Sequence, residues 1–124
     1  MKIRTIAFMG DSQKVINNWP ENVEEIIKFN LQALQCSLVS GFSNLPDWAN
    51  HGKVTDKKLK GNVLEGARQL TVKDKDSYRV VYVAEYQDKV YVIHAFKKKT
   101  EGVDKKAMNT VEARMKQLKD YLAD

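Results

Sequence analysis

Two neighbouring segments, residues 78–86 and 90–96, are dominated by valine, tyrosine and isoleucine, which are typical of β-strands. A short polar turn at Gln87 and Asp88 separates them. If the segments pair as a hairpin about this turn, Arg79 lies opposite Phe96, beside the run of three lysines at 97–99. The pattern therefore predicts four cations at one end of a small sheet, where an anion would relieve their mutual repulsion.

The N-terminal third predicts a strand and two helices. Residues 3–9 have the composition of a strand, and Asp11 and Ser12 are suited to cap a short helix over residues 13–19, which Pro20 ends. A second helix follows, with Phe29 and Cys36 on the side opposite its apolar face. That face has the spacing of a buried helical stripe: Val23, Ile26, Ile27, Leu31, Leu34 and Leu38.

The middle of the chain predicts a loop and a weaker strand. Residues 41–61 contain glycine, proline and asparagine without periodicity, so we expect a loop in which Trp48 is a structural anchor. Residues 63–72 predict a strand weakened by Gly66, and residues 73–77 a charged turn.

The C-terminal segment, residues 104–122, predicts an amphipathic helix. Its apolar stripe is Met108, Val111, Met115, Leu118 and Leu122. The whole order, β-α-α-β-β-β-α, predicts one α+β domain over residues 1–124, with a mostly antiparallel sheet of about four strands, N-terminal helices and a C-terminal helix.

Composition limits the function classes. The chain has 124 residues and a net charge of +5, with a pI near 9.3. We expect no signal peptide and no membrane span, and the single cysteine, Cys36, suits a reducing cytoplasm. One cysteine and two histidines lack the spacing of a zinc site, and no phosphate-binding glycine loop is present, so we expect neither metal nor cofactor.

The basic residues are clustered. Residues 53–60 contain four lysines against one aspartate, and residues 97–99 add three more. Such clustering favours nucleic acid or an acidic protein as partner, although it also suits a solvated surface. The candidate chemical groups near the predicted cationic end are Lys60, Glu65, Arg68, Arg79, His94, Lys97, Lys98 and Lys99.

This set suits metal-independent cleavage of RNA. The ribose 2′-hydroxyl attacks the adjacent phosphate once a base removes its proton, and fixed cations stabilise the added negative charge. Structural roles compete for several residues. Arg79 has Glu65 or Asp76 as alternative partners, Glu65 suits either a base or an ion pair, and His94 is read as a core histidine. Strand alternation sends Lys97 and Lys99 to one face and Lys98 to the other.

Several fragments, in order, resemble the HigB-like, phage-derived branch of the RelE/ParE toxin superfamily. They lie at residues 8–12, 19–20, 58–61, 63–65, 78–82 and 90–100, where the last reads VYVIHAFKKKT. The resemblance implies a compact RelE-like fold and the toxin of a type II toxin–antitoxin system. Such a toxin cuts mRNA on the ribosome without metal and is neutralised by a helix-turn-helix antitoxin.

The resemblance also implies roles for individual residues. Arg79 matches the arginine that contacts the scissile phosphate, and Lys98 and Lys99 best match the catalytic basic segment after the last strand. Glu65 is implied as a further catalytic residue, and Lys60, Arg68 and Lys97 as RNA-binding residues. We expect a cytoplasmic protein that is a monomer or weak dimer when free.

Two features depart from the family pattern. Gly66 stands where a bulky apolar residue is usual, and Arg68 follows Glu65 by three positions rather than two, which turns its side chain to the other face unless Gly66 forms a bulge. Two other functions stay open: a ParE-like toxin acting on DNA gyrase, and a non-enzymatic protein that binds an antitoxin or RNA.

Overall fold

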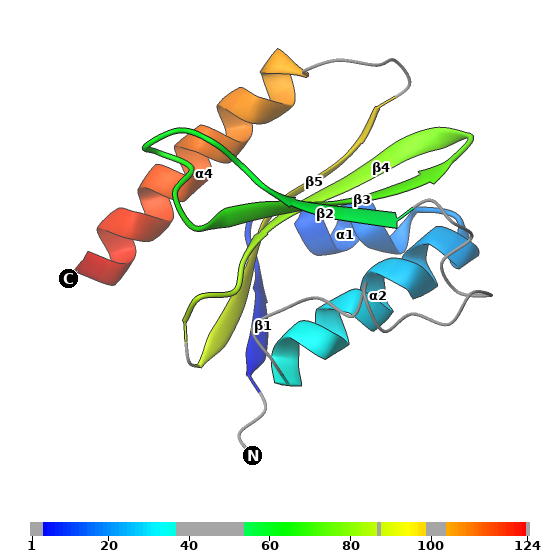
Figure 1. Ribbon diagram of the computed structural model, residues 1–124, viewed down its shortest axis with the longest axis horizontal. Coiled ribbons are helices and arrows are strands. Elements are labelled where there is room, and N and C mark those ends of the chain that lie inside the picture. Colours follow the sequence, from blue (N-terminus) through cyan, green and yellow to red (C-terminus); the bar gives the residue numbers. More distant parts are fainter. Residues whose placement is uncertain (1–3, 37–53, 87, 99–103, 124) are drawn as a thin grey trace.

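The computed structural model describes residues 4–36, 54–86, 88–98 and 104–123. In this part of the chain, five strands form one mixed sheet in the order β1-β5-β4-β3-β2 (Figure 1). The elements, in chain order, are β1 (Thr5–Phe8), α1 (Ser12–Asn17), α2 (Glu21–Cys36), β2 (Val54–Lys58), β3 (Ala67–Asp74), β4 (Asp76–Val83), β5 (Lys89–Lys98) and α4 (Lys105–Ala123). Only the β1–β5 pair is parallel.

Helices cover the two faces of the sheet unequally. α1 and α2 pack on one face, where Ile16, Val23 and Ile27 join a core with Leu70, Val80 and Tyr82 of the sheet. α4 lies on the other face, and Figure 1 shows it on the opposite side of the sheet from α2. Its partners there include Val81, Val83, Tyr91 and Ile93. Because α4 is a single helix, it covers only part of its face.

The helical periodicity of the sequence is confirmed with small differences. In α2, Val23, Ile26, Ile27, Leu31 and Leu34 are buried, and Phe29 is 41% exposed. Leu38, Trp48 and the greater part of the predicted loop lie outside the described residues. In α4, the buried stripe is Ala107, Val111, Met115 and Leu118, whereas the predicted Leu122 is exposed. No described helix is long and apolar enough to cross a membrane.

The predicted hairpin of the two valine-rich strands is confirmed. β4 pairs antiparallel with β5, and Arg79 lies opposite Phe96. The register shifts between Val81 and Tyr82, because Val81 pairs with His94 and Tyr82 with Val92. This leaves Ile93 as the extra residue of a β-bulge, and Ile93 packs under α4.

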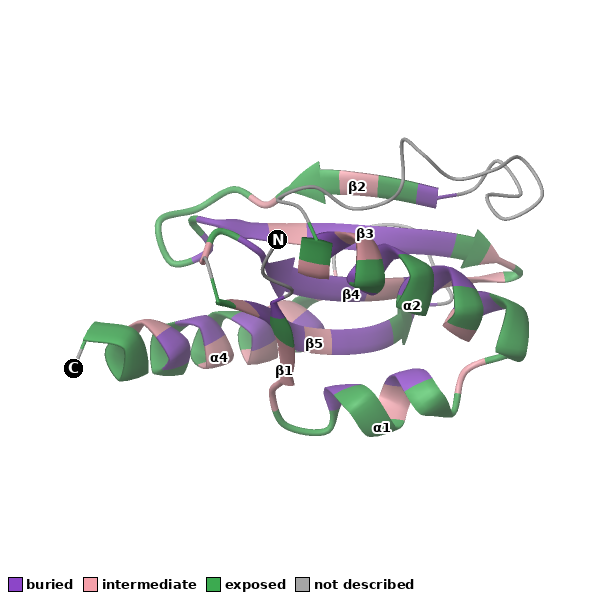
Figure 2. Ribbon diagram, turned by 90° about the horizontal axis from the view of Figure 1, so that it is seen from below, coloured by how far each residue is buried: buried purple, intermediate pink, exposed green. Residues whose placement is uncertain are grey.

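The predicted count of about four strands is too low by one. β2 falls inside the segment predicted as a loop, and it pairs with β3 from Val54–Val72 to Lys58–Arg68. Figure 2 shows why the sequence conceals it: β2 is mostly exposed at the margin of the sheet, in contrast to β3, β4 and β5. Its polar residues carry little of the apolar signal by which strands are recognised.

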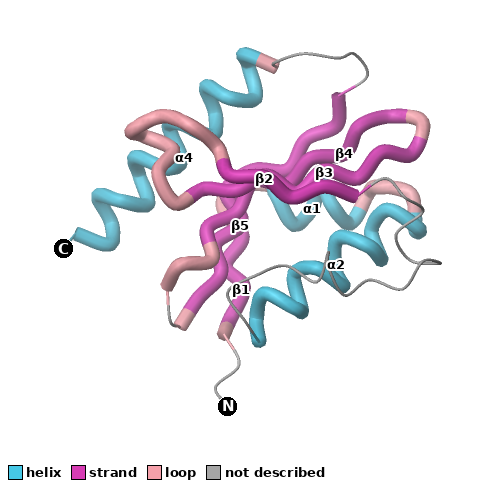
Figure 3. The backbone as a smooth tube through the Cα atoms, in the orientation of Figure 1, coloured by secondary structure: helices cyan, strands magenta, loops and turns pink. Residues whose placement is uncertain are grey.

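The second predicted strand, residues 63–72, begins too early. Residues 61–66 form turns, and β3 begins at Ala67. Gly66 has φ of +90°, and a Cβ atom there would lie 2.8 Å from a carboxylate oxygen of Glu85. A side chain at this position would therefore be both strained and crowded. The connection from β2 to β3 extends to α4 (Figure 3), where Lys119 Nζ donates to the carbonyls of Asn62 and Val63.

Arg114 of α4 ties three elements together. Its Nη1 donates to the Ile93 carbonyl at 3.0 Å and contacts His94 Nδ1 at 3.1 Å, and its Nη2 pairs with Asp11 at 3.4 Å. The predicted cap at Asp11 is wrong in this detail, because the Asp11 side chain makes no capping hydrogen bond to α1. Gly10, with φ of +56°, leaves space for the guanidinium, which a Cβ atom would displace.

Burial of His94, and then the nearby charge of Arg114, lower the pKa of the imidazole from its ordinary value. Because a guanidinium only donates, Nδ1 accepts and Nε2 carries the proton. His94 is therefore a neutral, half-buried histidine beneath α4.

We expect the lowered pKa of His94 to make stability depend on pH. The unfolded chain, with a histidine pKa of about 6.5, takes up the proton at higher pH than the folded protein. The contribution of His94 to the free energy of unfolding is therefore complete above the unfolded-state pKa. It is lost as pH falls from there through the folded-state pKa. Urea unfolding between pH 5 and 8 should show this decline, and His94→Gln should reduce it. An NMR titration that places the His94 pKa at or above 6.5 would contradict the assignment.

Candidate anion-binding groove

Side chains from four strands form regular rows on the face that α4 partly covers. The central row is Thr55 on β2, Thr71 on β3, Arg79 on β4 and Phe96 on β5, because each is paired with the next. Directly paired residues project to the same face. One flanking row is Lys73, Ser77 and Lys98, and the other is Lys57, Gln69, Val81 and His94. Arg79 lies in the central row, with lysines in both flanking rows.

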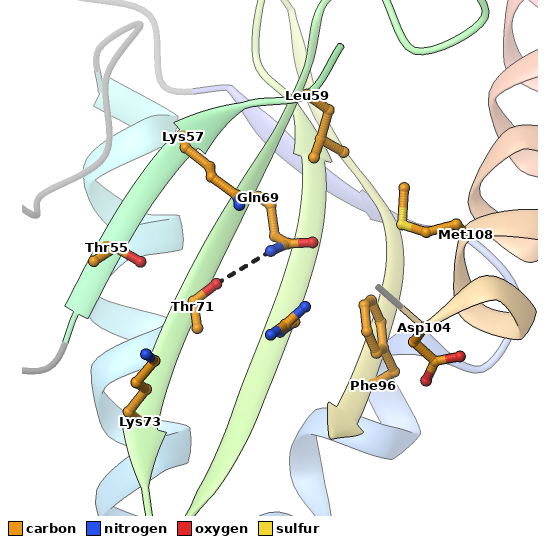
Figure 4. Close-up of a pocket in the computed structure, with 10 residues that line it drawn as sticks. Thr55, Lys57, Leu59, Gln69, Thr71, Lys73, Phe96, Asp104 and Met108 are labelled. Carbon is orange, nitrogen blue, oxygen red and sulfur yellow. Dashed lines mark hydrogen bonds between the residues drawn. The ribbon is translucent and has the colours of Figure 1, made fainter. Parts of the chain in front are cut away.

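A cavity of about 450 Å³ opens over these rows where α4 leaves the sheet uncovered. We call it the groove. It is lined by Thr55, Lys57, Leu59, Gln69, Thr71, Lys73, Arg79, Phe96, Asp104 and Met108. Figure 4 shows Phe96, Asp104 and Met108 along one side, with Thr55, Lys57 and Lys73 along the other. The groove therefore lies between the first turn of α4 and the strand β2.

Positive charge dominates the groove. Lys57 and Lys73 are exposed, and Arg79 is half-buried. Arg79 Nε donates to Ser77 Oγ at 3.2 Å, and no described carboxylate forms an ion pair with its guanidinium. Among the described lining residues Asp104 is the one acidic side chain, and its carboxylate accepts from the Ala107 backbone N–H at 3.0 Å. A guanidinium so placed has its terminal nitrogens available for a bidentate oxyanion.

The structure brings Lys98 to the face of Arg79. The two belong to adjacent rows, and Lys98 is only 7% exposed. Lys97 faces the other side of the sheet, because it is paired with Tyr78, whose ring belongs to the core under α1 and α2. The predicted alternation is therefore confirmed for Lys97 and Lys98. Lys97 Nζ lies 3.7 Å from Asp76. Lys99 lies outside the described residues.

Glu65 and Lys60 line a second cavity, of about 470 Å³, in the connection from β2 to β3. Leu59 lines both cavities, so the second cavity adjoins the groove. Both side chains are exposed. They thus lie next to the cationic rows rather than within them, at the end of the groove away from Lys73.

Arg68 lies on the opposite face of the sheet. It pairs with Tyr82, and its Nε donates to the Asp56 carboxylate at 2.9 Å. The Tyr82 hydroxyl donates to the same carboxylate. Burial, and then Asp56, raise the pKa of the Tyr82 hydroxyl. This network of three side chains joins β2, β3 and β4, and it separates Arg68 from Arg79.

The described residues contain no cluster of three or more His, Cys, Asp or Glu side chains placed to hold a metal ion. His94 is close to the groove through its stacking on Phe96, at a ring separation of 5.3 Å. Its Nδ1 is occupied by Arg114 and its Nε2 carries a proton. In this state the imidazole has no free lone pair to accept a further proton.

Sequence reasoning missed much of the groove lining. Lys57 and Thr55 fell within the predicted loop, and Gln69, Thr71 and Lys73 were not singled out. A signal was present: polar side chains at 69, 71 and 73 alternate with Leu70 and Val72, the period of a strand with one polar face. That period places Gln69, Thr71 and Lys73 together on one side of β3, opposite the core.

Comparison with protein families gives a match over residues 14–116 to the phage-derived protein Gp49-like family (DUF891). The chain belongs to this family. The Gp49-like family is part of the RelE/ParE-like toxin superfamily, in agreement with the broader resemblance found in the sequence. The comparisons with curated proteins and with solved structures gave no match.

We expect the exposed lysines of this Gp49-like protein's groove to contribute to binding of single-stranded RNA. Lys57→Ala or Lys73→Ala should each weaken binding and reduce the slope of log affinity against log salt by about 0.7. Fluorescence anisotropy over a range of salt concentrations measures both quantities. Lys97→Ala, the matched change on the other face, should leave the slope unchanged. An equal effect of Lys97→Ala would place the binding surface elsewhere.

Proposed function

We propose that this Gp49-like protein is a HigB-like toxin of a type II toxin–antitoxin system that cuts mRNA on the ribosome. The observation that carries the proposal is the position of Arg79, central in a cationic groove with its guanidinium open to a ligand. Membership of the Gp49-like family supports the toxin class. The groove supports RNA as the substrate, since its cations suit a phosphate backbone.

The proposed reaction uses the substrate's own nucleophile. The ribose 2′-hydroxyl gives its proton to a base, the 2′-oxygen forms a bond to phosphorus, and the bond from phosphorus to the 5′-oxygen breaks. The leaving 5′-oxygen takes a proton from water, so the products are a 2′,3′-cyclic phosphate and a 5′-hydroxyl. The additional negative charge on the non-bridging oxygens in the transition state is stabilised by Arg79, because its fork matches two oxygens at once.

Other residues contribute charge or proton transfer. Lys98 lies in the row next to Arg79 and adds positive charge from within the sheet. We assign Lys99 the same role from its place in the sequence. Glu65 is the proposed base, and Lys60 beside it binds the strand as it leaves the groove. With Arg68 and Lys97 on the far face, their contribution to RNA binding would require a second contact surface.

The proposed partner that neutralises the toxin is a helix-turn-helix antitoxin. An acidic segment of such a protein could cover the cationic groove. The exposed Phe29 and Cys36 on α2 offer a second contact for it. We propose that the free toxin is a cytoplasmic monomer or weak dimer.

Induction in a bacterial host, with mapping of mRNA 5′ ends and measurement of growth, tests the proposal. The wild type should arrest growth and create new ends within translated regions. Arg79→Ala should reduce cleavage by about 100-fold, the usual cost of removing one donor that stabilises a transition-state charge. Arg68→Ala provides the matched control, because it removes the same side chain from the other face and should keep cleavage at comparable protein levels.

Each alternative function gives a different result in this experiment. Growth arrest with intact mRNA and DNA-damage signalling would indicate gyrase as target and contradict the proposal. Absence of arrest, with the protein folded and accumulated, would indicate a binding protein without activity. Loss of cleavage in Arg68→Ala but not in Arg79→Ala would exclude the groove as the site.

The role of the 2′-hydroxyl can be tested separately. In a reconstituted translation system, we expect a single 2′-deoxy or 2′-O-methyl nucleotide at the mapped cleavage position to abolish cleavage there, because the nucleophile is missing. The same substitution one codon away should leave cleavage intact. Retained cleavage at the modified position would show that the nucleophile is another group.

A further inference from the structure

Two buried polar side chains form the floor of the groove. Gln69 is 4% exposed and Thr71 is 5% exposed, and both line the cavity. Gln69 Nε2 donates to Thr71 Oγ1 at 3.3 Å (Figure 4). Elsewhere on β3, the buried positions of the other face, Leu70 and Val72, are apolar. Polar groups with so little exposure are costly unless they are paired, so their place in the floor requires an explanation.

The hydrogen bond to Thr71 fixes the orientation of the Gln69 amide. One N–H of the amide is used, which leaves the second N–H and the carbonyl oxygen Oε1. Within the described part of the chain, Oε1 accepts no hydrogen bond and is not enclosed, so it faces the groove. The floor therefore offers a fixed donor and acceptor side by side.

Apolar walls accompany this polar floor. Phe96, Leu59 and Met108 line the groove, and the Phe96 ring stacks on His94 at an interplanar angle of 21°. His94 is in turn held by Arg114, so the Phe96 ring has a rigid support. A site that bound only phosphate would not require apolar side chains in its lining. A heteroaromatic ring with polar edges fits both the walls and the floor.

We propose that the groove takes one unpaired nucleobase of the RNA, packed against Phe96 and read along its edge by the Gln69 amide. This inference rests on the proposed function, and it names the residue that sets the base preference of cleavage. Gln69 is in the row adjacent to Arg79, one strand away, so a phosphate on Arg79 places the attached nucleoside above the amide. A carboxamide pairs bidentately with a base edge that has neighbouring donor and acceptor groups.

Binding of short RNAs tests the inference without reference to cleavage. Four homopolymeric trinucleotides are titrated into the purified protein by calorimetry. Wild type should discriminate between the best and worst base by about tenfold, and Gln69→Leu should remove this discrimination while retaining affinity from phosphate contacts. Phe96→Leu should weaken all four by about tenfold. Gln117→Leu, the same change at an exposed position of α4, should behave as wild type.

The base composition at mapped mRNA ends supplies the second measurement. Gln69→Leu should broaden the base preference at the cut, whereas Gln117→Leu should not. If wild type cuts mRNA and Gln69→Leu keeps its preference, the inference is overturned and the proposed function stands. If wild type discriminates between trinucleotides but cuts no mRNA, base reading is supported and the proposed function fails. Equal binding of all four trinucleotides by wild type, or no binding, overturns the inference.

Discussion

The antiparallel register of β3, β4 and β5 is the constraint on which the rest of the structure depends. Successive residues of β4 project to opposite faces: Val80 and Tyr82 enter the core under α1 and α2, and Arg79 and Val81 face the side of α4. A slip of one residue would place the Arg79 charge in the apolar core, at a cost of several kcal/mol. The core thus selects the register, and the register in turn assembles the cationic rows.

Because helices cover the two faces of the sheet unequally, part of one face stays open and forms the candidate site. Two helices seal one face, but the single helix α4 crosses the other and leaves its far end open. The β-bulge at Ile93 directs an additional apolar side chain under α4, and Arg114 holds the bulge by its carbonyl. The groove lies directly beyond this anchored contact. The apolar packing under α4 therefore lies on one side of Phe96, and the groove lies on the other.

The elements predicted from sequence were those whose signal is local. Valine-rich β4 and β5 and the stripes of α2 and α4 carry their own periodicity, and the partner of Arg79 followed from the hairpin alone. β2 could not be found in this way. Its strand conformation depends on pairing with β3 and on the contacts of Asp56 with Arg68 and Tyr82, residues that lie 12 and 26 positions away. Contacts between residues so far apart in the sequence cannot be recognised from the pattern of polar and apolar residues in a short segment.

The residues of the candidate site likewise include some that the sequence could identify and some that it could not. Arg79 and Lys98 could be chosen from their strands, because alternation on a predicted strand decides which residues share a face. Alternation also predicted that Lys97 faces away from Lys98, whereas the face of Arg68 depended on whether Gly66 forms a bulge and was decided by its pairing with Tyr82. Gln69 and Thr71 were overlooked because polar residues on a half-buried strand are ordinarily solvated, and only the structure shows that these two have little exposed surface.

The position of β2 at the margin of the sheet has a consequence for the behaviour of the free protein. In the described part of the chain, β2 is the outermost strand beside β3, and such strands invite pairing with other chains. Lysines on an outer strand oppose that pairing by charge repulsion, and Lys57 and Lys58 are both exposed on β2. Lys57 therefore lines the groove and, by charge repulsion, also opposes self-association of the free protein.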